Sequence, residues 1–559
     1  SRSGESPPWP MVGLVWTLLV LGWPTTAGAP SVWPLPIDLN LLPGPPIRLV
    51  PPAQASDFFQ LESRASSPIL AAAFARYAPL LFPHPSRVVV NEDSQTGVGA
   101  RSRTLSFVTI RVTDLDESHP TLHTDESYTL SVRELGLLTA ATVYGALRGL
   151  ETLSQLVVFD FDTESYYAPS VAIRDAPRFP HRGLMIDTAR HFEPLSAIRA
   201  MIDALPYAKL NVLHWHMVDA QSFPFQSLSS PRLWDGAFSP SERYTQADVA
   251  AVVEYARLRG VRVMVEFDMP GHNDAWCTGY PSICPSASCK SPLNVASNET
   301  FGRISALLRE LTGGRSSSRS SPSGLFPDEL LHLGGDEVNT ECWHSTPSVY
   351  RWLTDRNLSA DDGYAYFVRK VGETAISNGR RPVQWSEVFD HFKSKLDPRT
   401  VVHVWKGQTN VTEVLALGYQ VIRNVGYSNT SWYLDNLNVP WSAVYSNDPC
   451  ADVPAKLCAN VLGGHGEMWG ETVDASDLEQ TVWPRLAAIA ERLWSPIKAT
   501  VHPVDALWRL QDFRCRLLER GVRAAPVLNT VARAAPPRPG SCREQRRRRA
   551  GEGADTHVL

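Results

Sequence analysis

Residues 330–338 read Leu-Leu-His-Leu-Gly-Gly-Asp-Glu-Val, an apolar run that ends in two glycines and two acids. A short apolar run bounded by glycine is typical of a fully buried strand, and glycine lets the backbone approach a ligand closely. Polar side chains at the carboxyl ends of buried parallel strands are where barrel enzymes place their chemistry. Acidic pairs are also common in ordinary loops and helix starts, so the meaning of Asp336 and Glu337 depends on the rest of the chain.

Similar apolar runs alternate with helical segments on both sides of this stretch. We expect strands at 183–187, 210–218, 261–268, 330–334, 382–385, 401–405, 421–425 and 461–469. Helices are expected in the gaps, at 196–205, 246–259, 301–311, 364–378 and 411–417. Repeated βα units form a parallel sheet, and eight of them close into a barrel. The sequence therefore predicts an α/β fold with a (β/α)8 TIM barrel, followed by a C-terminal helix, over residues 177–534.

The region before the barrel predicts a smaller domain of a different type. Residues 56–176 combine helix-like periodicity at 57–81 and 142–156 with strand-like alternation at 105–112 and 127–132, which indicates an α+β domain. Residues 30–55 are rich in proline and are expected to form a linker or an extended lead-in.

The two ends of the chain and one insert differ from these domains in composition. Residues 1–29 contain an apolar run at 11–23 that is too short for a stable membrane span and has the length of a signal peptide core, with a buried helix or strand as the alternative. Residues 312–324 are rich in Ser, Gly and Arg and are expected on the face of the barrel away from catalysis. The tail 535–559, which contains Cys542, is expected to be mostly disordered.

Composition and cysteine usage favour the secretory pathway. The chain has 559 residues and a net charge of −5, which gives no sign of the basic face that a nucleic-acid partner needs. Asn298, Asn357, Asn410 and Asn429 each begin a glycosylation sequon. The eight cysteines show no CxxC spacing and fit disulfides better than metal, although reduced buried cysteines are the alternative. We expect an extracellular or a vacuolar/lysosomal location.

Nearly every expected strand is followed by a carboxylate, a histidine, an arginine or a large aromatic residue. These are Arg190, His214, His216, Asp219, Asp268, His272, Asp336, Glu337, Trp385, Trp405, Tyr433, Asp435, Glu467, Trp469 and Glu471. Acids that converge on a pocket walled by aromatic rings are typical of sugar hydrolases. A single tryptophan at a barrel end is more often plain packing, so the prediction rests on the whole set.

Other chemistries find little support in the sequence. No GxSxG or GxxxxGK[ST] motif occurs, which disfavours a serine hydrolase or a P-loop enzyme. His214 and His216 lie two apart and would point the same way from a strand, but no third metal ligand at a sensible spacing accompanies them. We therefore predict neither a metal nor a cofactor.

The motifs at these strand ends resemble those of the β-N-acetylhexosaminidases, glycoside hydrolase family 20. The resemblance rests on His332-Leu-Gly-Gly-Asp-Glu-Val, Arg182-Gly-Leu-Met-Ile-Asp-Thr-Ala-Arg-His, Asn211-Val-Leu-His-Trp-His-Met-Val-Asp, Pro270-Gly-His, Trp432-Tyr-Leu-Asp and Glu467-Met-Trp-Gly-Glu. It runs in order from about residue 57 to Cys542. The family fold is a small α+β domain before a (β/α)8 barrel, which matches the division expected above.

The resemblance implies an exo-acting enzyme that removes terminal β-linked N-acetylglucosamine or N-acetylgalactosamine with retention, through an oxazolinium intermediate. By position, Glu337 resembles the general acid, Asp336 the residue that orients the acetamido group, and Tyr433 the hydroxyl that binds the acetamido oxygen. The remaining implied roles fall to side chains that wall the pocket (Trp385, Trp405, Trp469), hold sugar hydroxyls (Arg190, Asp435, Glu471) or support the acid (Asp219, His272).

The resemblance also implies substrates, pairings and partners. Asp435-Asn436 suggests neutral sugars, in oligosaccharide, glycoprotein or glycolipid glycans, and family members often form homodimers. Cys342 resembles a cysteine bonded to Cys289 or Cys284, Cys515 resembles one bonded to Cys542, and Cys450 could pair with Cys458. The alternatives are a catalytically weak carbohydrate-binding protein of the same fold and an enzyme with a more open pocket that releases a disaccharide.

Overall fold

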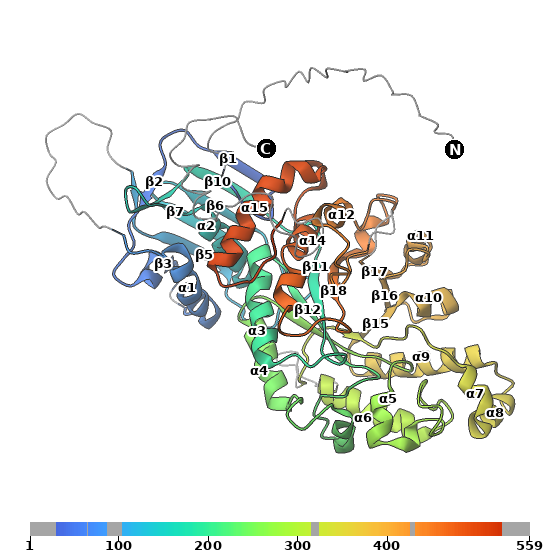
Figure 1. Cartoon of the computed structure of the whole chain (residues 1–559). Coiled ribbons are helices and arrows are strands. Elements are labelled where there is room, and N and C mark those ends of the chain that lie inside the picture. Colours follow the sequence, from blue (N-terminus) through green and yellow to red (C-terminus); the bar gives the residue numbers. More distant parts are fainter. Residues whose placement is uncertain (1–29, 64, 87–102, 315–323, 425–430, 528–559) are drawn as a thin grey trace, which may run out of the picture.

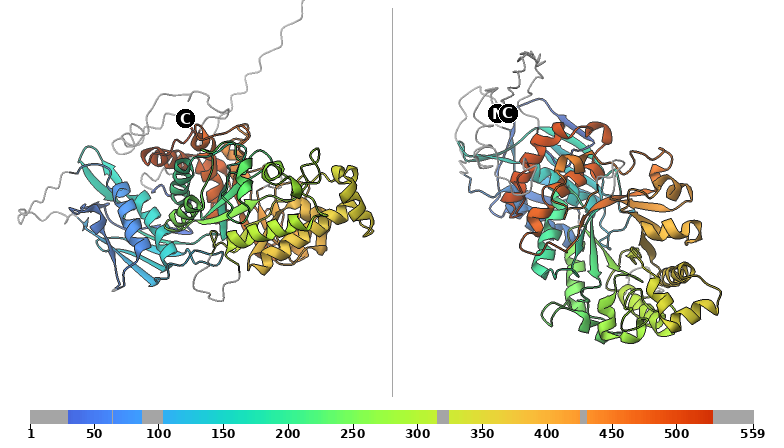
Figure 2. Two further views of the ribbon diagram at one scale, coloured as in Figure 1. Left: turned by 90° about the horizontal axis from the view of Figure 1, so that it is seen from below. Right: turned by 45° about the vertical axis from the view of Figure 1, so that its right-hand side comes forward.

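The computed structural model describes residues 30–63, 65–86, 103–314, 324–424 and 431–527. A barrel and a smaller domain lie side by side (Figures 1 and 2), with the smaller domain in blue to teal. The leader, the tail, most of the insert at 312–324 and the sequon at Asn429 lie outside the described residues. Within the described ranges, no helix has both the length and the apolar character that crossing a membrane requires.

All eight expected barrel strands form, and they close into one barrel in chain order. The strands are β11 (His181–Asp187), β12 (Val212–Val218), β13 (Arg262–Phe267), β14 (Leu330–His332), β15 (Arg381–Trp385), β16 (Val401–Val404), β17 (Gln420–Arg423) and β18 (Val461–Met468). Parallel pairing of β18 with β11 completes the ring. The (β/α)8 prediction is therefore confirmed, and only the strand ends differ, by a few residues.

Helices surround the barrel (Figure 1). They are α3 (Leu195–Ala204), α4 (Gln246–Arg257), α5 (Asp274–Gly279), α6 (Asn298–Thr312), α7 (Glu341–Ser345), α8 (Pro347–Thr354), α9 (Ala360–Ser377), α10 (Ser386–Phe392), α11 (Val411–Ala416), α12 (Trp441–Ser446), α13 (Leu478–Val482), α14 (Arg485–Trp494) and α15 (Pro503–Glu519). The five predicted helices correspond to α3, α4, α6, α9 and α11. Capping boxes begin two of them, at Thr245 for α4 and at Ser359 for α9, because each hydroxyl accepts an otherwise unpaired backbone N–H.

The described residues of the smaller domain form two sheets and two α-helices, which confirms the predicted α+β class. Its six-stranded sheet has the order β1-β10-β6-β7-β5-β3 and its four-stranded sheet the order β4-β2-β9-β8. The elements are β1 (Asp38–Leu41), β2 (Ile47–Leu49), β3 (Phe59–Leu61), α1 (Pro68–Leu81), β4 (Thr104–Leu105), β5 (Val108–Asp114), β6 (Tyr128–Val132), β7 (Gly136–Thr142), α2 (Val143–Leu156), β8 (Val158–Asp160), β9 (Ser165–Ala168) and β10 (Val171–Asp175). Every residue of α2 is buried.

Two predictions for this region are wrong. The proline-rich segment 30–55 is not a linker, because β1 pairs with β10 and β2 pairs with β9. Trp33, in the same segment, is fully buried and donates its indole N–H to the Ala487 carbonyl over 3.0 Å. The helix expected at 57–81 begins only at Pro68, where Ser67 caps it, and β3 precedes it. Proline favours the first turn of a helix and restricts the backbone of the residue before it, which explains why the helix begins at Pro68. The apolar periodicity of the sequence extends across the boundary between β3 and α1 and therefore does not mark it.

Buried polar contacts hold the smaller domain against the amino-terminal ends of the barrel strands. Glu126 accepts hydrogen bonds from Arg182 (2.7 Å) and Asn211 (2.9 Å), at the starts of β11 and β12. Asp175 accepts one from Lys209 over 2.7 Å, and both side chains are fully buried. Breaking a buried pair of this kind typically costs about 3–5 kcal/mol. The domain therefore braces one end of the barrel and leaves the other end open.

Candidate active site

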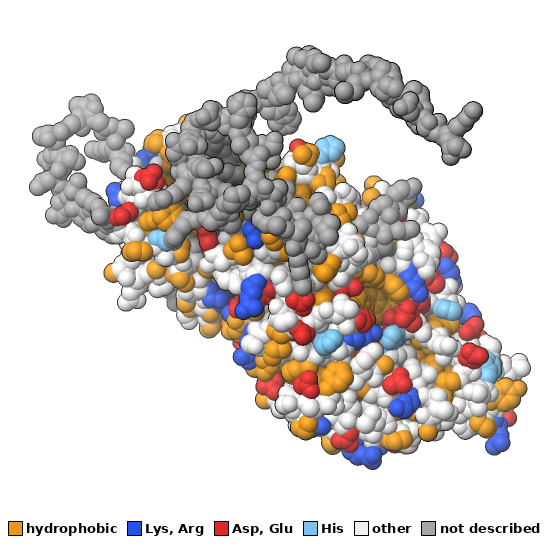
Figure 3. Space-filling view, viewed as in Figure 1, with side chains coloured by type: hydrophobic (Ala, Val, Ile, Leu, Met, Phe, Trp, Pro, Cys, Tyr) orange, Lys and Arg blue, Asp and Glu red, His pale blue; other side chains and the backbone are white. Residues whose placement is uncertain are grey.

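The carboxyl ends of the barrel strands surround a cavity of about 310 Å³, at the small end of the range for ligand sites. Its lining comprises Arg190, His272, Asp336, Glu337, Trp385, Trp405, Tyr433, Asp435, Trp469, Glu471 and Thr472. All of these except Thr472 belong to the set predicted from the sequence. In Figure 3, charged side chains surround a hollow with hydrophobic side chains at its bottom, in the region where Figure 1 shows β16 and β17.

Gly334 and Gly335 shape the turn that presents the two acids. Their φ angles are +66° and +97°, which side chains rarely adopt. A Cβ atom on Gly334 would lie 1.8 Å from Asp268 Oδ1, and one on Gly335 would lie 2.6 Å from a methyl group of Val388. The close approach that glycine allows here is therefore to the end of β13 and to α10, which lets β14 turn sharply into the cavity.

Asp336 and Glu337 differ in their surroundings although they are adjacent. Asp336 is 8% exposed, and its Oδ1 atom has no hydrogen-bond partner among the described residues. The Glu337 side chain is 58% exposed and faces the cavity. Glu337 also has a φ of +50°, a conformation that costs about 1–3 kcal/mol and is concentrated at functional sites. One acid is thus enclosed and the other is accessible to a ligand.

His272 contacts both acids and connects them to Asp219. Its Nε2 atom lies 3.6 Å from Asp336 Oδ2 and 3.7 Å from Glu337 Oε2, and its Nδ1 atom lies 3.2 Å from Asp219 Oδ1. Burial lowers the pKa of His272, but the hydrogen bond to Asp219 and the charge of Asp336 outweigh it and raise the pKa to about 9. His272 is therefore a cation at neutral pH. Asp219 lies behind the cavity lining and also pairs with Arg190 Nη2 over 2.8 Å.

Asp268 belongs to the predicted set of strand-end residues, but the sequence assigns it no role. It is buried at the end of β13, and its Oδ1 atom accepts the Gly335 N–H over 2.8 Å. Burial and the nearby charge of Asp336, to which it hydrogen-bonds, hold the pKa of Asp268 well above its usual range. The raised pKa favours the protonated form of Asp268, which can donate a hydrogen bond to Asp336.

Two of the three predicted tryptophans are held by buried acids, and the third lies beside an arginine. Trp385 donates its indole N–H to Glu266 Oε1 and Trp405 donates to Glu387 Oε2, each over 2.8 Å. The Arg190 guanidinium lies 5.0 Å from the ring centroid of Trp469. Glu266 and Glu387 are absent from the sequence prediction. They fix the orientation of the Trp385 and Trp405 rings, which wall the cavity.

Tyr433 and Asp435 reach the cavity from the segment after β17. Tyr433 forms an isolated parallel β-bridge with Glu467 of β18, and the Leu434 N–H donates to the Glu467 carbonyl over 2.7 Å. Burial raises the pKa of Asp435 to about 6, and Glu471 and Glu467 add to the shift. The backbone pairing with β18 places the Tyr433 and Asp435 side chains in the same cavity as Asp336 and Glu337.

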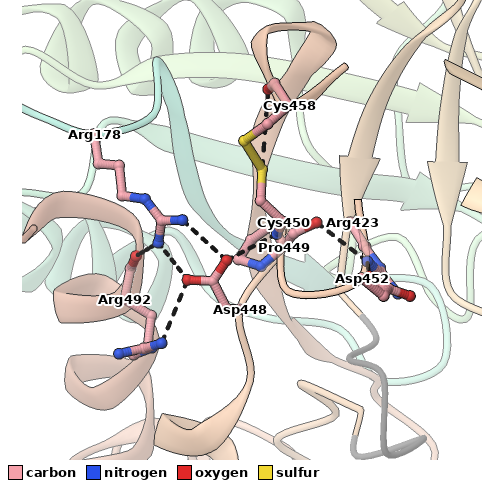
Figure 4. Close-up of a disulfide and its surroundings, with 8 residues drawn as sticks. All are labelled: Arg178, Arg423, Asp448, Pro449, Cys450, Asp452, Cys458 and Arg492. Atoms are coloured by element: carbon pink, nitrogen blue, oxygen red, sulfur yellow. Dashed lines mark hydrogen bonds and ion pairs between the residues drawn. A yellow bond between two sulfur atoms is a disulfide. The ribbon is translucent and has the colours of Figure 1, made fainter. Parts of the chain in front are cut away.

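The loop that leads from this segment into β18 is fixed by ion pairs and a disulfide (Figure 4). Arg178 donates to Asp448 over 2.9 Å, Arg423 donates to Asp452 over 3.0 Å, and Cys450 is bonded to Cys458. Cys289–Cys342 and Cys277–Cys284 are the other disulfides of the described residues, and these pairings confirm the expectation of disulfides. Cys542, the expected partner of Cys515, lies outside the described residues.

A cluster of buried histidines lies inside the barrel. His214 and His216 do point the same way, since Glu266 Oε2 lies 2.8 Å from His214 Nε2 and 2.7 Å from His216 Nδ1. His214, His403 and His465 each offer a ring nitrogen, and these atoms lie within 4.8 Å of one another. Sequence spacing could not reveal this group, because its members come from β12, β16 and β18.

A (β/α)8 barrel whose strand ends place two adjacent carboxyl groups among three tryptophans, around a cavity of this size, defines a sugar hydrolase. A family model described as "Glycosyl hydrolase family 20, catalytic domain" matches residues 179–497, and one described as "beta-acetyl hexosaminidase like" matches residues 32–156. The chain therefore belongs to glycoside hydrolase family 20.

Individual relatives agree with the family match. The chain is 43% identical to beta-hexosaminidase 1 of Arabidopsis thaliana, over 94% of this chain and 96% of the relative. It is 36% identical to beta-hexosaminidase subunit beta of Homo sapiens, over 89% of each. The X-ray structure of Flavobacterium johnsoniae chitobiase is similar with a TM-score of 0.75 and 28% identity, over 90% of this chain and 74% of that one. The chain is thus a glycosidase that removes terminal N-acetylhexosamine.

Proposed function

We propose that Glu337 is the general acid and base, that Asp336 orients the substrate's acetamido group, and that Tyr433 binds the acetamido oxygen. The observation that carries this assignment is the contrast between the two acids. Glu337 is accessible in the cavity, as an acid that meets the glycosidic oxygen must be, and Asp336 is enclosed with one unpartnered oxygen. An enclosed carboxylate is well placed to accept the acetamido N–H and to balance positive charge.

In the first step the 2-acetamido carbonyl oxygen attacks the anomeric carbon as the bond to the leaving oxygen breaks. Glu337 gives its proton to that oxygen, and the sugar becomes a cyclic oxazolinium ion. Asp336 stabilises the positive charge on the ring nitrogen. Water then attacks the anomeric carbon as its bond to the acetamido oxygen breaks, and the water gives a proton to Glu337. This step restores the acetamido group and the protonated acid and releases the sugar with retained configuration. The intramolecular attack gains several kcal/mol from proximity, and His272 holds both carboxyl groups in place.

The remaining lining residues support a substrate with one terminal sugar in the cavity. Trp385, Trp405 and Trp469 wall the acetamido methyl group and the sugar face, and Arg190, Asp435 and Glu471 bind its hydroxyls. A cavity of about 310 Å³ favours a single sugar over a disaccharide. Asp435 is followed by Asn436, which favours neutral N-acetylglucosamine and N-acetylgalactosamine at the ends of oligosaccharide, glycoprotein or glycolipid glycans.

We also propose a location in the secretory pathway, extracellular or vacuolar/lysosomal, and a homodimer. The three disulfides support an oxidising compartment, and the sequon residues Asn298, Asn357 and Asn410 are exposed. Several relatives are named as subunits of beta-hexosaminidase, which supports assembly of this chain with a second copy. A sedimentation mass equal to one chain would refute the dimer.

The test is release of 4-nitrophenol from its β-N-acetylglucosaminide by the wild type, Glu337→Gln and Glu341→Gln at mildly acidic pH. Glu341 is an exposed acid four residues away and is the matched control. We expect turnover by the wild type and the control, and a loss of about 10²–10⁴-fold in Glu337→Gln, the usual contribution of general acid catalysis. A folded wild type without turnover would favour the carbohydrate-binding alternative, and full activity in Glu337→Gln would refute the acid assignment.

A further inference from the structure

A chain of side chains in contact leads from the interior of the barrel to the cavity, and we call it the acid–histidine chain. It consists of Glu266, His216, Asp219 and His272. The ring of His216 lies between two acids, with Nδ1 2.7 Å from Glu266 Oε2 and Nε2 2.8 Å from Asp219 Oδ2. Asp219 Oδ1 lies 3.2 Å from Nδ1 of His272, which contacts both acids of the cavity. Glu266 and His216 are fully buried and lie behind the cavity lining.

His216 is a buried cation. Burial raises the pKa values of Glu266 and Asp219, but the neighbouring histidines outweigh it and hold both values below their usual range. Both acids are therefore ionised, and an ionised carboxylate can only accept hydrogen bonds. Each ring nitrogen of His216 then donates one, so the ring carries two protons and a positive charge. Burial lowers the pKa of His216, but the charge of Glu266 and the hydrogen bonds to both acids hold it well above its usual range.

The other groups around His216 leave the positive charge on this ring. His214, two residues earlier on β12, also lies 2.8 Å from the inner acid, but its second nitrogen faces His465 Nε2 over 3.3 Å instead of another acid. Burial lowers the pKa of His214 to about 4, so His214 is neutral where His216 is charged. Asp187 of β11 adds negative charge nearby, and the Trp469 ring packs edge-on at 5.1 Å.

Glu266 links the acid–histidine chain to the wall of the cavity. Its Oε2 atom accepts from His216, and its Oε1 atom accepts the indole N–H of Trp385 over 2.8 Å. His332 Nδ1 lies 3.1 Å from the same Oε1 atom. A buried polar group that loses its partner typically costs about 1–3 kcal/mol, and more when it is charged. One carboxylate therefore fixes both the His216 ring and a tryptophan of the cavity.

We propose that His216 and Glu266 are positioning residues that act on the two acids of the cavity through Asp219. Charges alternate along the chain, so each member orients the next, and buried networks of this kind are rigid when every member is paired. The last member, His272, is thereby held 3.6 Å from Asp336 and 3.7 Å from Glu337. The inference rests on the proposed function, in which these two acids perform the reaction. If His216 only filled the barrel, its loss would lower stability and leave kcat unchanged.

The test is a double-substitution cycle of His216→Gln and Asp219→Asn, measured as kcat for 4-nitrophenyl β-N-acetylglucosaminide. A small misplacement of catalytic groups costs up to about 10²-fold in rate, so His216→Gln alone should lower kcat about 10–100-fold. KM should change much less, because His216 does not line the cavity. In the Asp219→Asn background the same substitution should change kcat by no more than about twofold, because residues of one network are not additive. Losses that multiply, or a wild-type kcat in folded His216→Gln, would overturn the proposal.

Two further variants complete the cycle. Glu266→Gln keeps the shape of the side chain and an oxygen for the Trp385 indole N–H, and it removes the charge that faces His216. It should lower kcat as His216→Gln does, and the two losses should again not multiply. His181→Gln is the matched control, because His181 is also a fully buried histidine of the barrel and lies outside the acid–histidine chain. We expect a lower melting temperature and an unchanged kcat for this control.

Neutron diffraction from wild-type crystals at pH 7 provides a measurement that needs no variant to fold. We expect hydrogen on both ring nitrogens of His216 and on only one nitrogen of His214. A single hydrogen on His216 would overturn the proposal. Full activity in Glu337→Gln would instead refute the proposed function and would leave the hydrogen positions unchanged, so the two failures are distinguishable.

Discussion

Asp336→Asn separates the catalytic role of Asp336 from its role in the fold. The substitution removes a negative charge and preserves the shape of the side chain. In the wild type this charge lies beside protonated Asp268 and the His272 cation, and one of its oxygens has no protein partner. We therefore expect that the substitution causes a large loss of activity and no loss of stability.

The size of the catalytic effect follows from the hydrogen bond that Asp336 is proposed to make. A preorganised polar group that meets charge in the transition state contributes about 2.7–4 kcal/mol. At 1.36 kcal/mol for each factor of ten, kcat should fall about 10²–10³-fold. KM should change much less, because the positive charge on the acetamido nitrogen develops only as the oxazolinium ion forms.

The effect on stability follows from the contact with Asp268. Two neighbouring carboxylates repel each other, and they do so more strongly in a buried site than in water. Asp268 avoids this repulsion when it keeps its proton, so the repulsion destabilises the folded wild type only in part. Asp336→Asn relieves the repulsion from Asp268 but also removes the attraction between the Asp336 carboxylate and the His272 cation at 3.6 Å, so we expect little net change in stability at neutral pH.

The assay is the kcat for 4-nitrophenyl β-N-acetylglucosaminide, together with the thermal unfolding temperature at pH 7. Asp355→Asn, at an exposed position, is the control for removal of one acid. A kcat within threefold of the wild type would refute the proposed role of Asp336. A melting temperature several degrees below that of the wild type would refute the account of its pairing with Asp268.

Three further substitutions test the geometry and charge of the site. Gly334→Ala should abolish soluble folded protein, because its Cβ atom would lie 1.8 Å from Asp268 Oδ1 at a positive φ; recovery of a normal melting temperature would contradict this. Burial and neighbouring acids raise the pKa of Glu193 to about 8, so the wild type loses stability as the pH rises from about 4.5 through 8. Glu193→Gln should therefore be the more stable protein at pH 8 and show little difference at pH 4, as judged by urea unfolding. Removal of His272 should have the opposite effect on stability, because its raised pKa stabilises the fold below about pH 6.5 and this stabilisation is lost as the pH rises through about 9. His272→Gln should be destabilised by up to about 3 kcal/mol at pH 6 and by much less at pH 10, and an equal loss at both values would refute the cation.

The chain sequence by itself determined the architecture and most of the cavity lining. The alternation of apolar strands and amphipathic helices is a local pattern, and eight such units have few ways to bury their strands other than a closed barrel. Because the strands of a barrel end on one face, residues such as Arg190, Asp336 and Trp405 could be assigned to a common site from their positions alone. Of the lining residues, only Thr472 was absent from that set.

Only the tertiary structure decided which of these groups touch and what charge they carry. Segment 30–55 looked like a linker because its prolines are visible in the sequence, whereas its partners β9 and β10 lie more than 100 residues away. The proton on Asp268, the charge on His272 and the convergence of His214, His403 and His465 all depend on burial and on neighbours from other strands. Desolvation and close charges are properties of the folded environment, so no local pattern in the chain records them.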